Sequence, residues 1–167
     1  MSATGAATAR PPCTEDEVVL QRAGLLEAGV VAALQQVCFP EEPWDEASVA
    51  TLIGPPGGFA ILALRGGEPV GFVMTRVAAE DGEILAIGVL PAGRRSGVGR
   101  RLVGAALDGS RSLGATALFL EVAEDNEAAR TLYKTCRFFS VGRRPGYYKR
   151  TDGRVAALVL RHSFAPG

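Results

Sequence analysis

Residues 84–99 carry the stretch Ile-Leu-Ala-Ile-Gly-Val-Leu-Pro-Ala-Gly-Arg-Arg-Ser-Gly-Val-Gly, which decides the fold. Its apolar first half is typical of a β-strand, and residues 98–106 are apolar at helical spacing. The first amides of a helix have no internal partner, and the helix dipole places partial positive charge on them. The stretch therefore predicts a strand, an anion-binding loop and a helix. The candidate ligand-binding residues of the loop are Arg94, Arg95, Ser96, Gly97, Val98 and Gly99.

Two common phosphate-binding loops do not match this pattern. A nucleoside triphosphate loop of the P-loop class needs a Gly-Lys pair, which the sequence lacks. A dinucleotide fingerprint needs Gly-x-Gly-x-x-Gly, but Leu102 occupies the position of the third glycine. A glycine-rich turn that binds no ligand is the remaining structural alternative.

A third pattern matches at every position. In it, Arg-x-x-Gly-x-Gly follows a strand that ends in Val-x-Pro, and the matching residues are Val89, Pro91, Arg94, Gly97 and Gly99. This arrangement resembles the acetyl-CoA loop of the GNAT N-acetyltransferase superfamily. The resemblance implies an acetyl-CoA-dependent N-acetyltransferase, with acetyl-CoA as co-substrate and its pyrophosphate on the loop amides.

Motifs in the C-terminal half are similar to those of the RimI branch of this superfamily, the ribosomal-protein-alanine N-acetyltransferases. The branch reads Leu-Glu-Val and then Asn-x-x-Ala-x-x-Leu-Tyr, which match residues 120–122 and 126–133. The resemblance spans about residues 15–160 and implies transfer to the α-amino group of a protein N-terminus. One departure is Arg137, which follows a helix where the family has glycine. A left-handed backbone there costs a non-glycine residue about 1 kcal/mol.

The resemblance assigns catalysis to Glu121 and Tyr133. Glu121 ends an apolar strand, where desolvation would make its carboxylate a stronger base for the amine proton. The phenol of Tyr133, with an ordinary pKa of about 10, would protonate the leaving thiolate. The alternatives are that Glu121 is a structural acceptor for a loop amide or an arginine, and that Tyr133 belongs to the core.

The resemblance also implies where the pantetheine arm and the acceptor bind. Ile87 and Val89 are expected to contact the pantetheine through their backbone groups, and Gly88 between them fits a β-bulge or tight packing. Asn126 matches a position that contacts the pantetheine and equally suits a helix cap. Trp44 and Tyr147 match positions near the peptide entrance of RimI-like proteins, although a lone tryptophan also suits packing.

Two other functions stay open at the level of the sequence. One is acetylation of a small-molecule amine, such as an antibiotic or a polyamine. The other is a non-catalytic acetyl-CoA-binding module, against which the presence of both Glu121 and Tyr133 argues. None of these patterns specifies an oligomeric state.

Composition limits the class of protein. The 167 residues suit one domain, and 18 basic residues balance 18 acidic ones, so no nucleic-acid partner is expected. Three cysteines, Cys13, Cys38 and Cys136, and a single histidine, His162, lack the spacing of a zinc site, so no metal is expected. An odd cysteine count without a signal peptide favours the cytoplasm. No apolar run is long enough to span a bilayer, so no association with a membrane is expected.

The expected fold class is α/β (α+β), namely the GNAT fold. It has a mixed, mostly antiparallel sheet of about six to seven strands with helices on both faces. Residues 1–14 are expected to be a disordered tail before one GNAT domain at 15–165. Asp45 is expected to cap a helix, and Asp81-Gly82 to form a turn. Expected strands are 17–22, 59–64, 69–77, 84–90, 117–122, 138–141 and 155–160, and expected helices are 25–38, 46–53, 98–113 and 127–136.

Overall fold

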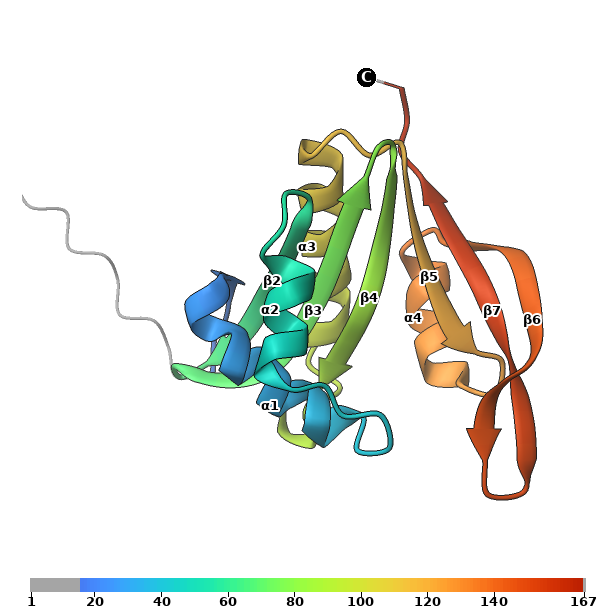
Figure 1. Ribbon diagram of the computed structural model, residues 1–167, viewed down its shortest axis with the longest axis horizontal. Coiled ribbons are helices and arrows are strands. Elements are labelled where there is room, and N and C mark those ends of the chain that lie inside the picture. The colour runs from blue at the N-terminus through green and yellow to red at the C-terminus, as the bar shows by residue number, and fades with distance from the viewer. Residues whose placement is uncertain (1–15, 167) are drawn as a thin grey trace, which may run out of the picture.

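The computed structural model describes residues 16–166, so the expected tail at 1–14 and Cys13 lie outside the described residues. Seven strands form one sheet in the order β1-β2-β3-β4-β5-β7-β6 (Figure 1). All neighbouring strands are antiparallel except β4 and β5, which are parallel. The predicted mixed, mostly antiparallel sheet with helices on both faces is therefore confirmed.

The elements follow the order expected from the sequence. The strands are β1 (Val18–Ala23), β2 (Gly58–Arg65), β3 (Glu68–Ala78), β4 (Asp81–Val89), β5 (Ala117–Ala123), β6 (Phe139–Arg150) and β7 (Gly153–Ser163). The helices are α1 (Ala28–Cys38), α2 (Glu46–Ile53), α3 (Val98–Ser112) and α4 (Glu127–Thr135), with short 3₁₀ turns at Leu25–Glu27 and Pro91–Gly93. Asp45 caps α2 as predicted, because its side chain accepts a hydrogen bond from the amide of Ser48 at 2.8 Å.

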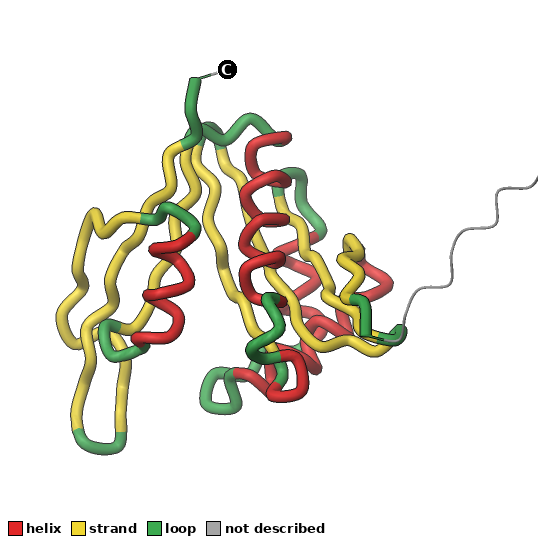
Figure 2. The backbone as a smooth tube through the Cα atoms, turned by 180° about the vertical axis from the view of Figure 1, so that it is seen from behind, coloured by secondary structure: helices red, strands yellow, loops and turns green. Residues whose placement is uncertain are grey.

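Helices lie on both faces of the sheet, and each face has its own apolar core. α1 and α2 pack over β2, β3 and β4, where Phe72 and Met74 are fully buried. α3 and α4 lie on the opposite face (Figure 2), where Leu102 and Leu118 are buried. Side chains alternate along a strand, so the same strand that buries Leu118 directs Glu121 to the face of α1 and α2. Glu121 therefore stands beyond the strands that these two helices cover.

The sheet opens between its two parallel strands. The β4–β5 ladder consists of three residue pairs, Asp81–Ala117, Gly82–Leu118 and Glu83–Phe119. Beyond Glu83 the strands diverge, as Figure 1 shows for their lower ends. The backbone groups of β4 that face this opening have no ladder partner, and such groups require another partner.

Two expectations about the strands are wrong. The turn between β3 and β4 lies at Ala79-Glu80 rather than at Asp81-Gly82, because Ala79 adopts the left-handed backbone with φ 54°. β6 and β7 form a hairpin much longer than the predicted 138–141 and 155–160. The extra residues of β6 are mostly exposed and include four charged side chains, two glycines and a proline, so they lack the apolar alternation by which a strand is recognised.

The prediction of a left-handed residue after α4 is confirmed. Arg137 has φ 62°, and its amide donates to the carbonyl of Lys134 at 3.0 Å. The chain thus forms the left-handed turn without a glycine. Among residues 16–166, no helix is both long enough and apolar enough to cross a membrane.

Candidate active site

The loop that precedes α3 presents free backbone amides. Gly97 caps the helix in the left-handed conformation, with φ 77°. The amides of Val98, Gly99 and Arg100 begin the helix, and they have no hydrogen-bond partner within the described part of the chain. Nothing lies within 4 Å of the position where a Cβ would stand on Gly97. The loop therefore offers an open, positively polarised cradle of the kind that binds a phosphate group.

Side chains brace this loop from behind. Arg65, at the end of β2, donates to the carbonyl of Ala92 at 3.0 Å and to the hydroxyl of Ser96 at 2.7 Å. Ser96 in turn donates to the carbonyl of Gly93 at 2.8 Å, and Arg94 donates from Nε to the carbonyl of Val89 at 3.2 Å. Ser96 is thus a structural residue of the loop. Arg65 has no motif to mark it, and only its contacts in the fold reveal this role.

The end of β4 directs backbone groups into the opening of the sheet. The amide of Leu90 donates to Val70 of β3 at 2.8 Å. Backbone groups alternate sides along an antiparallel strand, so those of Ile87 and Val89 face away from β3, toward β5. This is the side on which β5 has separated, which agrees with the expected pantetheine contacts.

The expected bulge at Gly88 is wrong, and the alternative of tight packing is observed. Met74 pairs with Ala86 and Thr75 with Ile84, so the irregularity lies at Leu85. Gly88 itself is regularly paired with Phe72. A Cβ on Gly88 would lie 2.7 Å from the sulfur of Cys38 and 2.8 Å from Cε1 of Phe72, so close packing explains the glycine.

Glu121 is partly buried and ion-paired. Its Oε1 lies 3.0 Å from Nε of Arg144 on β6, and 23% of its side chain is exposed. The ion pair matches the alternative in which an arginine contacts Glu121. Proximity to this carboxylate also raises the pKa of Tyr147, the exposed tyrosine of β6.

Tyr133 is a buried residue of α4, with 6% of its surface exposed. Its ring packs edge-on against Phe138, with the ring centroids 5.8 Å apart. Burial, with smaller contributions from Tyr148 and Cys136, raises the pKa of Tyr133 to about 12. The phenol is therefore protonated at any working pH, and the side chain also fills the core as the alternative foresaw.

Tyr148 and Arg144 complete this group, and neither was among the predicted site residues. The pKa of the half-buried Tyr148 is raised, first by burial and then by the Glu121 charge. Tyr148 also contributes to the raised pKa of Tyr133, so it interacts electrostatically with both predicted catalytic residues. The Arg-Arg and Tyr-Tyr pairs of β6 were the sequence signal that could have identified both.

Asn126 and Trp44 have clear structural roles. The side chain of Asn126 caps α4 by accepting from the amide of Ala129 at 3.2 Å. Trp44 packs against the core beneath α1 and α2, and its amide donates to the side chain of Gln35 at 2.7 Å. Their contacts with pantetheine and acceptor stay predictions.

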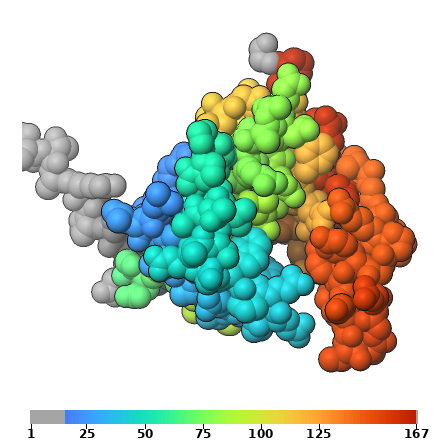
Figure 3. All heavy atoms as spheres, viewed as in Figure 1, coloured from blue at the N-terminus to red at the C-terminus, as the bar shows by residue number. Residues whose placement is uncertain are grey.

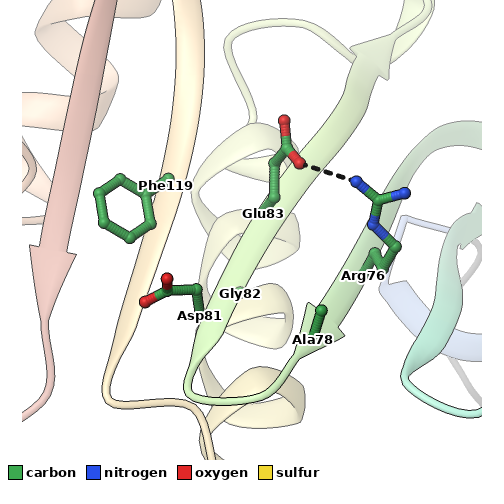
Figure 4. Close-up of a pocket in the computed structure, with 6 residues that line it drawn as sticks. All are labelled: Arg76, Ala78, Asp81, Gly82, Glu83 and Phe119. Atoms are coloured by element: carbon green, nitrogen blue, oxygen red, sulfur yellow. Dashed lines mark hydrogen bonds and ion pairs between the residues drawn. The ribbon is translucent and has the colours of Figure 1, made fainter. Parts of the chain in front are cut away.

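Two hollows mark the surface on the side of α1 and α2. Figure 3 shows one between the connection of α1 and α2, in cyan, and the β6–β7 hairpin, in orange and red. The two walls face each other in this view (Figure 3). Glu42 of the connection makes a small contribution to the raised pKa of Tyr147 and Tyr148 on the hairpin. The second hollow, of about 280 Å³, lies at the closed end of β4 and β5, where Arg76 pairs with Glu83 at 3.2 Å (Figure 4). None of the predicted site residues lines it.

A search for metal ligands found no cluster of three or more His, Cys, Asp and Glu side chains between residues 16 and 166. Among the titratable groups that the site brings together are those of Glu121, Arg144 and the tyrosines Tyr133, Tyr147 and Tyr148, with Glu42 opposite. This set can hold and move protons.

Comparison with known proteins gives three concordant matches. A model of the acetyltransferase (GNAT) family matches residues 30–138. The chain is 34% identical over 150 residues to the N-alpha-acetyltransferase RimI of Mycobacterium tuberculosis, covering 87% of this chain and 88% of that protein. It is 31% identical over 118 residues to the ribosomal protein bS18-alanine N-acetyltransferase of Escherichia coli K12, covering 71% and 79%.

The fold is likewise similar to that of a solved structure. The crystal structure of the ribosomal-protein-S18-alanine N-acetyltransferase from Escherichia coli superposes with a TM-score of 0.82 at 24% identity. The superposition covers 90% of this chain and 96% of the other. At this level of identity the likeness establishes a common fold.

Proposed function

We propose that this chain, which belongs to the acetyltransferase (GNAT) family, transfers the acetyl group of acetyl-CoA to the α-amino group of a protein N-terminus. The predicted superfamily and its RimI branch are confirmed by the relatives. One structural observation carries the proposal. The sheet opens between β4 and β5, with the free amides of α3 at one end of the opening and Glu121 beside it.

The chain's residues fit acetyl-CoA as co-substrate. The amides of Gly97, Val98 and Gly99 would hold its pyrophosphate, and the left-handed Gly97 leaves the space in front of them open. The backbone groups of Ile87 and the amide of Val89 would pair with the pantetheine arm in place of the missing neighbour strand, while the carbonyl of Val89 accepts from Arg94. Bound in this way, acetyl-CoA supplies the thioester.

Proton transfer falls to Glu121 and Tyr133. An α-amino group has a pKa of about 8, so roughly one tenth of it is neutral and able to attack at pH 7. The nitrogen bonds to the thioester carbon as the carbon–sulfur bond breaks. Glu121 takes the proton that the amine loses, and Tyr133 gives its proton to the thiolate that leaves.

The hollow between the α1–α2 connection and the β6–β7 hairpin is the proposed acceptor site. Tyr147 stands on its hairpin wall with 49% of its surface exposed, and tyrosines there would line a narrow entrance. Trp44 would support the opposite wall from its packed position. A small first residue on the acceptor suits such an entrance, as in the relative that is named for an alanine acceptor.

A competition experiment tests the acceptor class. A peptide with a free Ala or Ser at its start competes with the same peptide blocked at that end and carrying a lysine, and mass spectrometry locates the acetyl group. The α-amine should react faster, because a lysine amine with a pKa of about 10.4 is far less neutral at pH 7. Faster reaction of the blocked peptide, or reaction of small amines alone, would contradict the proposal. Acetyl-CoA binding without any transfer would instead indicate the non-catalytic module.

The proposed partners are acetyl-CoA and a protein N-terminus, and the proposed location is the cytoplasm. Both cysteines within residues 16–166, Cys38 and Cys136, are free thiols, which suits a reducing compartment. The balanced charge of the chain supports no nucleic-acid partner.

A further inference from the structure

Arginines of β6 pair with carboxylates at the end of β5 and in the turn that follows it. Arg143 contacts both oxygens of Glu124, from Nε at 3.2 Å and from Nη2 at 2.9 Å. Arg150 contacts both oxygens of Asp125 in the same two-point manner, at 3.2 Å and 3.1 Å. Both carboxylates are fully engaged, and these pairs attach the β6–β7 hairpin to the rest of the sheet.

The pair between Arg144 and Glu121 differs from its neighbours. The ion pair joins Nε of Arg144 to Oε1 of Glu121 at 3.0 Å, without the two-point hydrogen bonding of Arg143, and a hydrogen bond with the same carboxylate contributes to the raised pKa of Tyr147. The guanidinium is itself fixed, because its Cζ lies 5.7 Å from the centroid of the Tyr147 ring, over the ring face. The side chain of Glu121 is 23% exposed, against 41% for that of Glu124. Glu121 is therefore less exposed than Glu124 and is held through a single close ion-pair contact rather than a two-point pair.

We propose that Arg144 is a positioning residue, which orients Glu121 through a single contact at Oε1 and leaves the carboxylate able to accept the proton of the acceptor amine. The inference rests on the proposed function, because it takes Glu121 as the base. An unpaired glutamate samples several rotamers, and each misplaced rotamer removes the base from reach of the proton. A two-point pair like that of Glu124 would restrict the side chain equally but would occupy both oxygens.

The test measures steady-state kinetics with a peptide that begins with Ala. Arg144→Gln is expected to lower kcat about tenfold, a part of the roughly 100-fold that a positioned base contributes. Acetyl-CoA affinity, measured by calorimetry, should not change. Arg144→Lys should recover part of the rate, because lysine keeps the charge but lacks the planar Nε donor. This variant also keeps the test usable if Arg144→Gln does not fold.

Arg143→Gln is the matched control, because it removes the neighbouring arginine, whose side chain is 54% exposed against 58% for Arg144. It should leave kcat within about twofold of the parent, because Arg143 pairs with Glu124 and not with Glu121. A difference of a few tenths of a kcal/mol is the usual scatter between independent sites. If Arg144 served only to attach the hairpin, Arg144→Gln and Arg143→Gln would have equal effects. Both variants would then show a raised acceptor KM and a lowered thermal midpoint.

A double-mutant cycle gives the sharpest outcome. Because Arg144 acts through Glu121, adding Arg144→Gln to Glu121→Gln should slow the reaction no further. An equal loss in both backgrounds, or a loss at Arg143→Gln as large as at Arg144→Gln, would overturn the inference. A parent enzyme that acetylates no peptide α-amine would overturn the proposed function, and the inference with it.

Discussion

Burial distinguishes Tyr133 from the two other tyrosines near the site. Tyr147 is exposed and Tyr148 half-buried, whereas burial raises the pKa of Tyr133 to about 12. A phenol this weakly acidic stays protonated, and it is a poorer acid toward a thiolate of pKa about 8.5 than an exposed tyrosine would be. Its hydroxyl is therefore poised as a donor, and its ring serves the core.

Replacing Tyr133 with Phe should slow the transfer while keeping the fold. The ring still fills its place against Phe138, and only the hydroxyl is lost. The expected loss is in kcat, with acceptor KM nearly unchanged, as for a group that acts only in the transition state. Steady-state kinetics with the peptide acceptor measures both constants. A raised KM with the parent's kcat would show that the hydroxyl binds the acceptor instead.

The raised pKa of Tyr133 also predicts loss of stability in alkali. Its folded pKa of about 12 exceeds the unfolded value of about 10, so the folded protein holds this proton more tightly. The stabilisation is complete below pH 10 and is lost as the pH rises through 12. Between pH 9 and pH 11 the free energy of unfolding of the parent should fall by about 1.4 kcal/mol more than that of Tyr133→Phe. Urea unfolding at pH 9 and pH 11 measures the difference, and parallel losses would contradict it.

Arg137 carries a local backbone cost that glycine would remove. Its φ of 62° is left-handed, and this costs a non-glycine residue about 1 kcal/mol. Arg137→Gly should raise the free energy of unfolding by about that amount in urea titrations. Arg111→Gly is the control, because the same change inside α3 should destabilise by about 1 kcal/mol. Destabilisation by both variants would mean that the Arg137 side chain contributes more than its backbone costs.

At the scale of elements, the two ends of α3 allow a matched comparison. Gly97 at the start has φ 77° and Gly114 after the end has φ 89°, and neither has an atom within 4 Å of a built Cβ. Gly97→Val and Gly114→Val should therefore cost similar stability, about 1–2 kcal/mol for the left-handed backbone. Gly97→Val alone should weaken acetyl-CoA binding, because its side chain stands in front of the helix amides. We expect a Kd at least roughly tenfold higher by calorimetry, about 1.4 kcal/mol. Unchanged affinity in a folded Gly97→Val variant would remove the loop from the binding site.

At the scale of the whole molecule, the ligand should join the two halves of an opened sheet. Acetyl-CoA at 100 times its Kd is expected to stabilise the fold by about 2.7 kcal/mol, raising the thermal midpoint by roughly 5–10 °C. Hydrogen exchange should locate the effect. The amides of Ile87 and Val89 should gain protection, while Glu83, already in the ladder with β5, should not. Protection confined to other strands would contradict binding in the opening.

Short-range chemistry is what the sequence by itself determined. The loop glycines at 97 and 99, the caps at Asp45 and Asn126, and the left-handed turn at Arg137 each depend on a few neighbouring residues. Backbone sterics and the unpaired amides of a helix end act over one turn, so a local pattern is enough to specify them. With the periodicity of the strands and helices, these features were sufficient to predict the order of elements and the family.

Only the tertiary structure decided which distant side chains meet. Arg144 and Glu121 are 23 positions apart in the sequence but form an ion pair. In the sheet β7 lies between β5 and β6, so the side chain of Arg144 extends from β6 across β7 to Glu121 on β5. The later residues of β6 have no apolar period, so the full length of the strand could not be assigned from the pattern. The same holds for Gly88, where the contact with Cys38 rather than a bulge requires glycine. Packing between elements is set by the whole core at once, and this is why the orientation of the proposed base depends on the fold.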